Sequence, residues 1–218
     1  MRIGIIGAGM IGSTLAQLWV DAGHDVRVAS RHPDELKSMV EHLGTRASAG
    51  TPQDAATFGD VVMLTVPLKA VPDLARDLAP ALAQKIVLDT GNAYERRDGA
   101  VVRQASAHPQ GSAGWAAAMF PRSRWVKAFN TVYYKTLQTE AHRNGDRIGI
   151  PLASDEAEAL HTAAGLVRDI QVRRRFSCRM SAESLAQTAQ PFGRHPVRAV
   201  GYQHRRNQGE RDGERPVR

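Results

Sequence analysis

RIGIIGAGMIG, residues 2–12, decides the fold of this chain, because an apolar run leads into three glycines spaced as G-x-G-x-x-G. The run RIGII (2–6) predicts a buried strand, and residues 10–22 place apolar side chains at helical spacing. A glycine-rich turn between a strand and a helix is the context in which this motif binds a dinucleotide. The stretch therefore predicts a Rossmann-type fold.

Each position of the turn has its own expected role. Gly7 permits the tight turn, Gly9 lets a pyrophosphate approach the backbone because it has no Cβ, and Gly12 allows close helix packing. Met10 and Ile11 open the helix, whose N-terminal N–H groups favour an anion. We expect these five residues to bind the cofactor. The alternative is a glycine-rich turn that binds nothing.

The chain up to residue 170 alternates apolar runs with amphipathic stretches. Strands are predicted at DVRVAS (25–30), VVMLTVP (61–67), KIVLDT (85–90), WVKAFNT (125–131) and RIGIPLAS (147–154). Helices are predicted over 33–44 and over 154–170, the second with Ser154 as its cap. The alternation predicts an α/β domain over residues 1–170 with a doubly wound, mostly parallel sheet.

The end of the second predicted strand indicates the cofactor. An acidic residue there would bind the ribose 2′-hydroxyl of NAD and repel a 2′-phosphate, but this chain has Ser30 and Arg31. Ser30 can donate to a phosphate oxygen, and Arg31 can pair with the phosphate and lie against the adenine. Lys37 is a more distant source of charge. The sequence predicts NADP(H), unless Arg31 is only a solvated surface residue.

Three later strand ends should meet in one crevice, because ligands of open α/β sheets bind beyond the carboxyl ends of the strands. These ends are residues 65–67, 89–92 and 127–131. The alternative role for Pro67 is that it only ends the strand and contacts no ligand. The expected contacts on the nicotinamide side are Thr65, Val66, Pro67, Asn92, Ala128 and Asn130.

No arrangement of residues predicts a general acid or base, a nucleophilic triad or a metal site. His24, His32 and His42 lie in the region of the second predicted strand and helix. His161 lies on a late predicted helix, where a surface histidine or one with satisfied hydrogen bonds is favoured. Hydride transfer between two cofactors needs neither acid nor metal; it needs two rings with the reacting carbons about 3–3.5 Å apart. The aromatic residues that could wall such a pocket, with core or surface packing as the favoured alternative, are Trp115, Phe120, Trp125, Tyr133 and Tyr134.

Several of these stretches together resemble one known family. MRIGIIGAGMIGSTLA (1–16), SR (30–31), TVP (65–67), VKAFNT (126–131) and GIPLASDEAEA (149–159) are similar to the coenzyme F420-dependent NADP reductase family and its small bacterial relatives. KAFNT also resembles the cytoplasmic oxidoreductase domain of six-transmembrane metalloreductases. The resemblance covers about residues 1–170.

The resemblance implies hydride transfer between NADP(H) and F420, a flavin or a related acceptor. It implies that residues 9–12 contact the pyrophosphate, that Ser30 and Arg31 hold the 2′-phosphate, and that residues 65–67 lie along the nicotinamide. The archaeal enzymes have a histidine where Asn130 stands, which leaves the acceptor open. Two other functions remain: a non-catalytic NADP(H) sensor, or a reductase of a small imine or carbonyl substrate, whose usual helical C-terminal domain does not follow residue 170.

The net charge of +7 does not predict a nucleic-acid partner. Residues 1–170 carry 18 basic and 18 acidic residues, so the whole excess lies in residues 171–218, with 11 arginines against 4 acids. One cysteine, Cys178, excludes an intrachain disulfide. No apolar run could span a membrane, and the opening residues lack signal-peptide features. We expect a cytoplasmic protein with a small-molecule partner, and a homodimer is a reasonable expectation.

The chain changes character after Ile170, where a strand is due and QVRRRFSCRM (171–180) follows. The irregular tail over 171–218 has three explanations: a basic arm, a disordered extension, or a shift of reading frame near residue 170. The frame shift is favoured because all 11 basic residues are arginine and none is lysine. It predicts a sheet that lacks its late strand and leaves an edge exposed.

Overall fold

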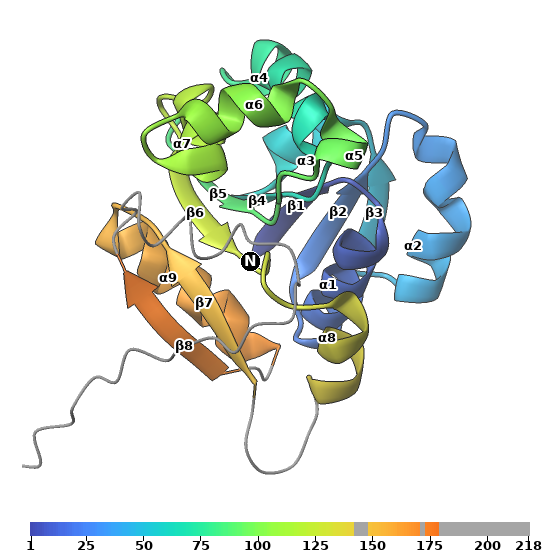
Figure 1. Cartoon of the computed structure of the whole chain (residues 1–218). Coiled ribbons are helices and arrows are strands. Elements are labelled where there is room, and N and C mark those ends of the chain that lie inside the picture. Colours follow the sequence, from blue (N-terminus) through green and yellow to red (C-terminus); the bar gives the residue numbers. More distant parts are fainter. Residues whose placement is uncertain (142–147, 171–172, 179–218) are drawn as a thin grey trace, which may run out of the picture.

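The computed structural model describes residues 1–141 and 148–170 in full, and the backbone of residues 173–178. These residues form one eight-stranded sheet in the order β3-β2-β1-β4-β5-β6-β7-β8. Helices cover both faces of the sheet (Figure 1). The predicted doubly wound, mostly parallel α/β fold is confirmed.

Six strands run parallel and end at one edge of the sheet. They are β1 (Arg2–Ile6), β2 (Asp25–Ala29), β3 (Ala47–Gly50), β4 (Val61–Leu64), β5 (Ile86–Asp89) and β6 (Arg124–Ala128). The register pairs Ile6 with Ala29 and with Leu64, and Leu64 in turn with Asp89. The loops after these strands therefore begin at the same level. The short strand β3, with the sequence ASAG, carries no branched or aromatic residue and was not predicted.

The last two strands extend the sheet past residue 170. Strand β7 (Gly149–Ala153) is antiparallel to β6, and β8 (Arg173–Cys178) is parallel to β7. The expectation that the sheet lacks its late strand is therefore wrong. The sequence RRRFSC lacks the side-chain pattern that is typical of a strand. The strand β8 is instead defined by the pairing of its backbone with β7. Residues 179–218, the rest of the predicted tail, lie outside the described residues.

Two hydrophobic clusters fill the two faces of the sheet. One lies under α1 (Met10–Asp21), the η1–α2 segment (Pro33–Leu36 and Lys37–Leu43), α8 (Tyr134–Glu140) and α9 (Ala157–Asp169). The other lies under α3 (Pro52–Phe58), the η2–α4 segment (Leu68–Ala70 and Val71–Leu78), α6 (Val101–Ala107) and α7 (Gly111–Ala118). The single turn α5 (Glu95–Asp98) precedes α6. None of the described helices is long and apolar enough to cross a membrane.

The start of α9 differs from the prediction. The helix begins at Ala157 with Glu156 as its N-cap, so Ser154 does not cap it. Instead, the Ser154 hydroxyl donates to the Trp125 carbonyl at 2.7 Å and accepts the Glu156 N–H at 3.2 Å. Ser154 therefore ties the entry of α9 to strand β6.

Two glycines allow backbones to approach closely. A Cβ on Gly12 would lie 2.0 Å from the Gly7 carbonyl oxygen, which agrees with its predicted role in helix packing. A Cβ on Gly4, in β1, would lie 2.2 Å from the Ala55 carbonyl oxygen in α3. The role of Gly4 was not predicted, because it depends on a helix that lies more than 50 residues away in the sequence.

Candidate functional site

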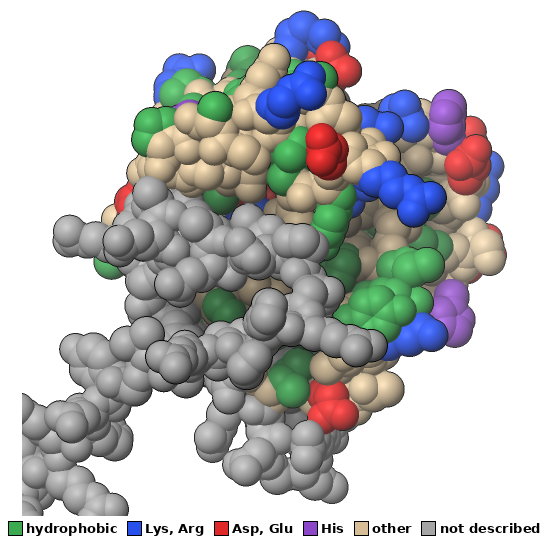
Figure 2. All heavy atoms as spheres, viewed as in Figure 1, with side chains coloured by type: hydrophobic (Ala, Val, Ile, Leu, Met, Phe, Trp, Pro, Cys, Tyr) green, Lys and Arg blue, Asp and Glu red, His purple; other side chains and the backbone are tan. Residues whose placement is uncertain are grey.

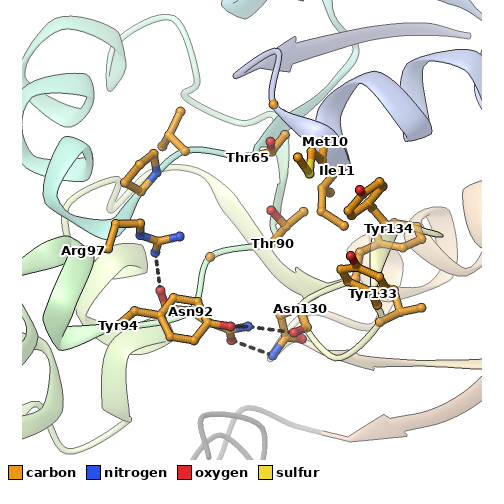
Figure 3. Close-up of a pocket in the computed structure, with 16 residues that line it drawn as sticks. Met10, Ile11, Thr65, Thr90, Asn92, Tyr94, Arg97, Asn130, Tyr133 and Tyr134 are labelled. Atoms are coloured by element: carbon orange, nitrogen blue, oxygen red, sulfur yellow. Dashed lines mark hydrogen bonds between the residues drawn. The ribbon is translucent and has the colours of Figure 1, made fainter. Parts of the chain in front are cut away.

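A pocket of about 310 Å³ opens at the carboxyl edge of the sheet, between the turn after β1 and the loops after β4, β5 and β6 (Figure 3). The predicted contacts that line it are Gly9, Met10, Ile11, Thr65, Val66, Pro67, Asn92 and Asn130. Gly7 and Gly12 belong to the turn but do not line the cavity. Ser30 and Arg31 also do not line it. The three strand ends therefore converge as expected.

The turn after β1 fits a bound pyrophosphate. Gly7 has a φ of +112°, a backbone conformation that favours glycine, and a Cβ there would lie 2.5 Å from the Thr65 carbonyl oxygen. Gly9 is the N-cap of α1, where no side chain caps the helix. Apart from its two chain neighbours, no described residue places an atom within 4 Å of the position that a Cβ on Gly9 would take. Uncapped N–H groups thus face open space, as an anion site at a helix N-terminus requires.

Ser30 and Arg31 lie directly beside this turn. The Gly7 N–H donates to the Ala29 carbonyl at 3.0 Å, so the residues after β2 adjoin the residues after β1. The Ser30 hydroxyl accepts the His32 N–H at 3.0 Å and keeps its own hydrogen for another acceptor. Arg31 is exposed, and within the described residues its guanidinium makes no hydrogen bond or ion pair. Both side chains are available to a ligand phosphate.

A buried ion pair supports the loop after β5 from inside the core, although neither of its residues lines the pocket. Lys127 and Asp89 are 5% and 7% exposed, and the Lys127 ammonium donates to Asp89 Oδ2 at 2.8 Å and to the Gly91 carbonyl. Asp89 Oδ1 accepts the Gly91 N–H at 2.7 Å. The pair therefore fixes the loop that carries Thr90 and Asn92. The sequence showed both charges at strand ends, but only the register of β5 and β6 pairs them.

Two amides join the loops after β5 and β6. Asn92 Nδ2 donates to the Asn130 carbonyl at 2.8 Å, and Asn130 Nδ2 donates to Asn92 Oδ1 at 3.3 Å (Figure 3). Phe129 turns the chain here with a φ of 60°, a conformation that is strained for an aromatic residue, and its ring packs edge-on against Trp19. Ala128 is fully buried in the core and does not line the pocket, so its placement does not support the predicted contact.

The aromatic candidates divide into two groups. Tyr133 and Tyr134 line the pocket with ring centroids 4.7 Å apart. A hydrogen bond with Tyr133 raises the pKa of the Tyr134 hydroxyl above its usual range. Phe120 and Trp125 instead stack on each other in the core at 5.3 Å, where they cannot wall the cavity. Trp115 likewise does not line the cavity. Phe120, Trp125 and Trp115 therefore serve in packing, which was the favoured alternative to a role in the pocket wall.

The loop after β5 adds two pocket residues that sequence reasoning missed, Tyr94 and Arg97. Asp98, which does not line the pocket, pairs with Arg97. Asp98 is 4% exposed and accepts hydrogen bonds from Arg97 at 2.8 Å, from the Tyr94 N–H at 3.0 Å and from the Lys69 N–H at 3.3 Å. Burial raises the pKa of Asp98, but these hydrogen bonds outweigh it and hold the pKa below its usual range. Asp98 thus connects the loops after β4 and β5. Its only sequence signal is a charge cluster after a strand end.

Asp98→Asn is expected to lower the free energy of unfolding at neutral pH by about 1–3 kcal/mol, because an amide replaces one charged acceptor with a donor. The folded-state pKa is depressed, so the contribution of the carboxylate is complete above about pH 4 and is lost as the pH falls through the folded-state pKa. Urea denaturation across this range should show the two proteins converging in acid. A difference that does not change with pH would contradict this role.

Comparison with known proteins places the chain among oxidoreductases. The sequence profile of the family described as "NADP oxidoreductase coenzyme F420-dependent" matches residues 2–93. The F420-dependent NADP reductase of Methanothermobacter thermautotrophicus is 31% identical over 190 residues, which cover 82% of this chain and 81% of that protein. This chain belongs to the coenzyme F420-dependent NADP oxidoreductase family. The predicted resemblance to this family is confirmed.

Other relatives of this NADP oxidoreductase differ in size. Metalloreductase STEAP3 of Rattus norvegicus is 30% identical over 167 residues, which are 77% of this chain. The chain spans about a third of that metalloreductase, 32% of its length. The crystal structure of a hypothetical protein from Sinorhizobium meliloti matches with a TM-score of 0.71 and 28% identity, over 89% of this chain and 91% of that one. The fold of this chain is therefore shared along nearly the whole length of that protein.

Proposed function

We propose that this NADP oxidoreductase transfers a hydride between NADP(H), bound along the carboxyl edge of the sheet, and a flavin or deazaflavin ring. The observation that carries the proposal is the composition of the pocket. It runs from the phosphate-binding turn at Gly9 to a wall of amides and aromatic rings at Asn92, Asn130 and Tyr133. None of the described residues that line it is Asp, Glu, His, Lys or Cys. Such a lining suits a reaction whose chemistry is carried by two cofactors.

The residues of the chain bind and orient in this proposal. The turn at residues 9–11 binds the pyrophosphate, while Ser30 and Arg31 bind the 2′-phosphate beside it. Residues 65–67 flank the nicotinamide ribose, because they follow the next strand of the sheet. The paired amides of Asn92 and Asn130 line the pocket beside the position proposed for the nicotinamide, which supplies or accepts the hydride when bound.

The rim of the pocket favours a large, flat acceptor. Met10, Tyr94 and Tyr133 are 63%, 45% and 57% exposed, which is unusual for large apolar side chains. Hydrophobic side chains gather on the face of the molecule around α1 and α8 (Figure 2). A planar ring that enters beside them would cover apolar surface and exclude water from the nicotinamide.

The names of two relatives support reduction and differ in the acceptor: one is an F420-dependent NADP reductase and the other a metalloreductase. The test is NADPH oxidation with F420, FMN, FAD and a ferric chelate in parallel. We expect turnover with F420 or with a flavin. NADPH binding without turnover of any acceptor would indicate a sensor, and turnover of the ferric chelate alone would indicate a metalloreductase; both results overturn the proposal.

NADPH is expected to bind at least about tenfold more tightly than NADH, because Arg31 forms a charge-assisted contact with the 2′-phosphate. Arg31→Ala should remove most of this preference. The matched control is Arg46→Ala, since Arg46 pairs with Asp25 at the opposite end of β2. Fluorescence titration with both dinucleotides measures the ratio. Equal affinities of the unmodified protein for NADPH and NADH would refute the assignment.

A further inference from the structure

The guanidinium of Arg97, at the wall of the pocket, has one nitrogen that donates no hydrogen bond to any described residue. Arg97 Nε donates to Asp98 at 3.1 Å, and Nη2 donates to Asp98 at 2.8 Å and to the Asn92 carbonyl at 2.7 Å. The guanidinium lies 4.9 Å from the centre of the Tyr94 ring (Figure 3). Within the described residues, Nη1 donates no hydrogen bond. Asp98 and Tyr94 thus hold the guanidinium in place at the pocket wall with one edge uncommitted.

The strand order separates Arg97 from both phosphate positions of NADP. The 2′-phosphate position follows β2 and the pyrophosphate position follows β1, whereas Arg97 follows β5 on the other side of β4. This places Arg97 on the nicotinamide side of the crevice. A dinucleotide bound as proposed brings no phosphate to this side, so an anion that pairs with Arg97 would come from the second substrate.

We propose that Arg97 binds a phosphate on the side chain of the flavin-like acceptor and thereby selects phosphorylated acceptors over the same ring without a phosphate. This inference rests on the proposed function. The guanidinium is well suited to the task, because its planar fork matches phosphate oxygens and its orientation is already fixed.

FMN and riboflavin make the test direct, because they share one ring and differ in the phosphate. The unmodified protein should show a higher kcat/KM for FMN, mainly through a lower KM. Arg97→Gln should reduce the FMN-to-riboflavin ratio of kcat/KM by about tenfold. Arg96→Gln is the matched control, since it removes the same charge from an adjacent exposed residue that does not line the pocket. That variant should keep the ratio.

Arg97→Lys serves as a second variant, because it keeps a cation beside the buried Asp98 carboxylate while it removes the planar fork. It should fold and should also lose most of the FMN preference. If the protein reduces neither a flavin nor F420, the proposed function fails. Flavin fluorescence in the presence of NADP⁺ then still compares the affinities for FMN and riboflavin. Equal values for the two flavins in the unmodified protein overturn the role of Arg97. Weaker NADPH binding by Arg97→Gln with an unchanged flavin ratio also overturns it.

Discussion

Gly9→Val is expected to abolish NADPH binding and to leave the protein folded. Gly9 has φ −72° and ψ −174°, which any residue adopts. Within the part of the chain that the structure describes, a Cβ there would meet no atom within 4 Å beyond its chain neighbours. The valine side chain would therefore occupy only the space over the N-terminus of α1, where the pyrophosphate is expected. We expect affinity for NADPH to fall by at least about a hundredfold, the equivalent of about 2.7 kcal/mol.

Two measurements test this separation of binding from folding. Fluorescence titration reports NADPH affinity, and thermal denaturation without NADPH reports stability. Gly165→Ala, in α9 and away from the pocket, is the control glycine variant and should bind NADPH normally. Gly12→Ala should instead destabilise the fold, because its Cβ would meet the Gly7 carbonyl. Normal NADPH binding by Gly9→Val would show that the turn is only structural.

Lys127→Met is expected to lower the free energy of unfolding by about 3–5 kcal/mol, because it leaves the Asp89 carboxylate buried without its partner. The double variant Lys127→Met with Asp89→Asn removes both charges and keeps an oxygen that accepts the Gly91 N–H. It should recover much of the lost stability. Urea denaturation of the single and double variants measures the difference. Equal losses in both would show that the unpaired charge is not the cause.

The parts of the site that follow from local sequence were predictable. The turn at residues 7–12 is a continuous motif whose glycines each have a local backbone reason, and Ser30 and Arg31 lie at a fixed distance from it. The strand ends at residues 65–67 and 130 were found in the same way, because parallel strands end at one edge. Even so, the burial of Ala128 shows that the sequence did not tell which side chain of a strand end faces the pocket.

The parts that depend on tertiary contacts were not predictable. Asp98 acts through the Lys69 N–H, which is 29 residues away and adjoins it only because β4 and β5 are neighbours. The same holds for Asp89 and Lys127, whose pairing requires the strand register. Strand β8 forms although its sequence lacks apolar alternation, because the edge of β7 supplies the hydrogen-bond partners.

In the proposed complex, the dinucleotide would accept hydrogen bonds from the N-terminal N–H groups of α1, which no side chain of the described residues caps. No side chain caps the helix, so water must satisfy its first N–H groups whenever a pyrophosphate does not. A ligand that binds only the folded state adds stability by mass action, about 2.7 kcal/mol at a hundred times its dissociation constant. The resistance of this oxidoreductase to unfolding should therefore follow the size of the NADP(H) pool around it, which links its lifetime to the redox cofactor supply of the cell.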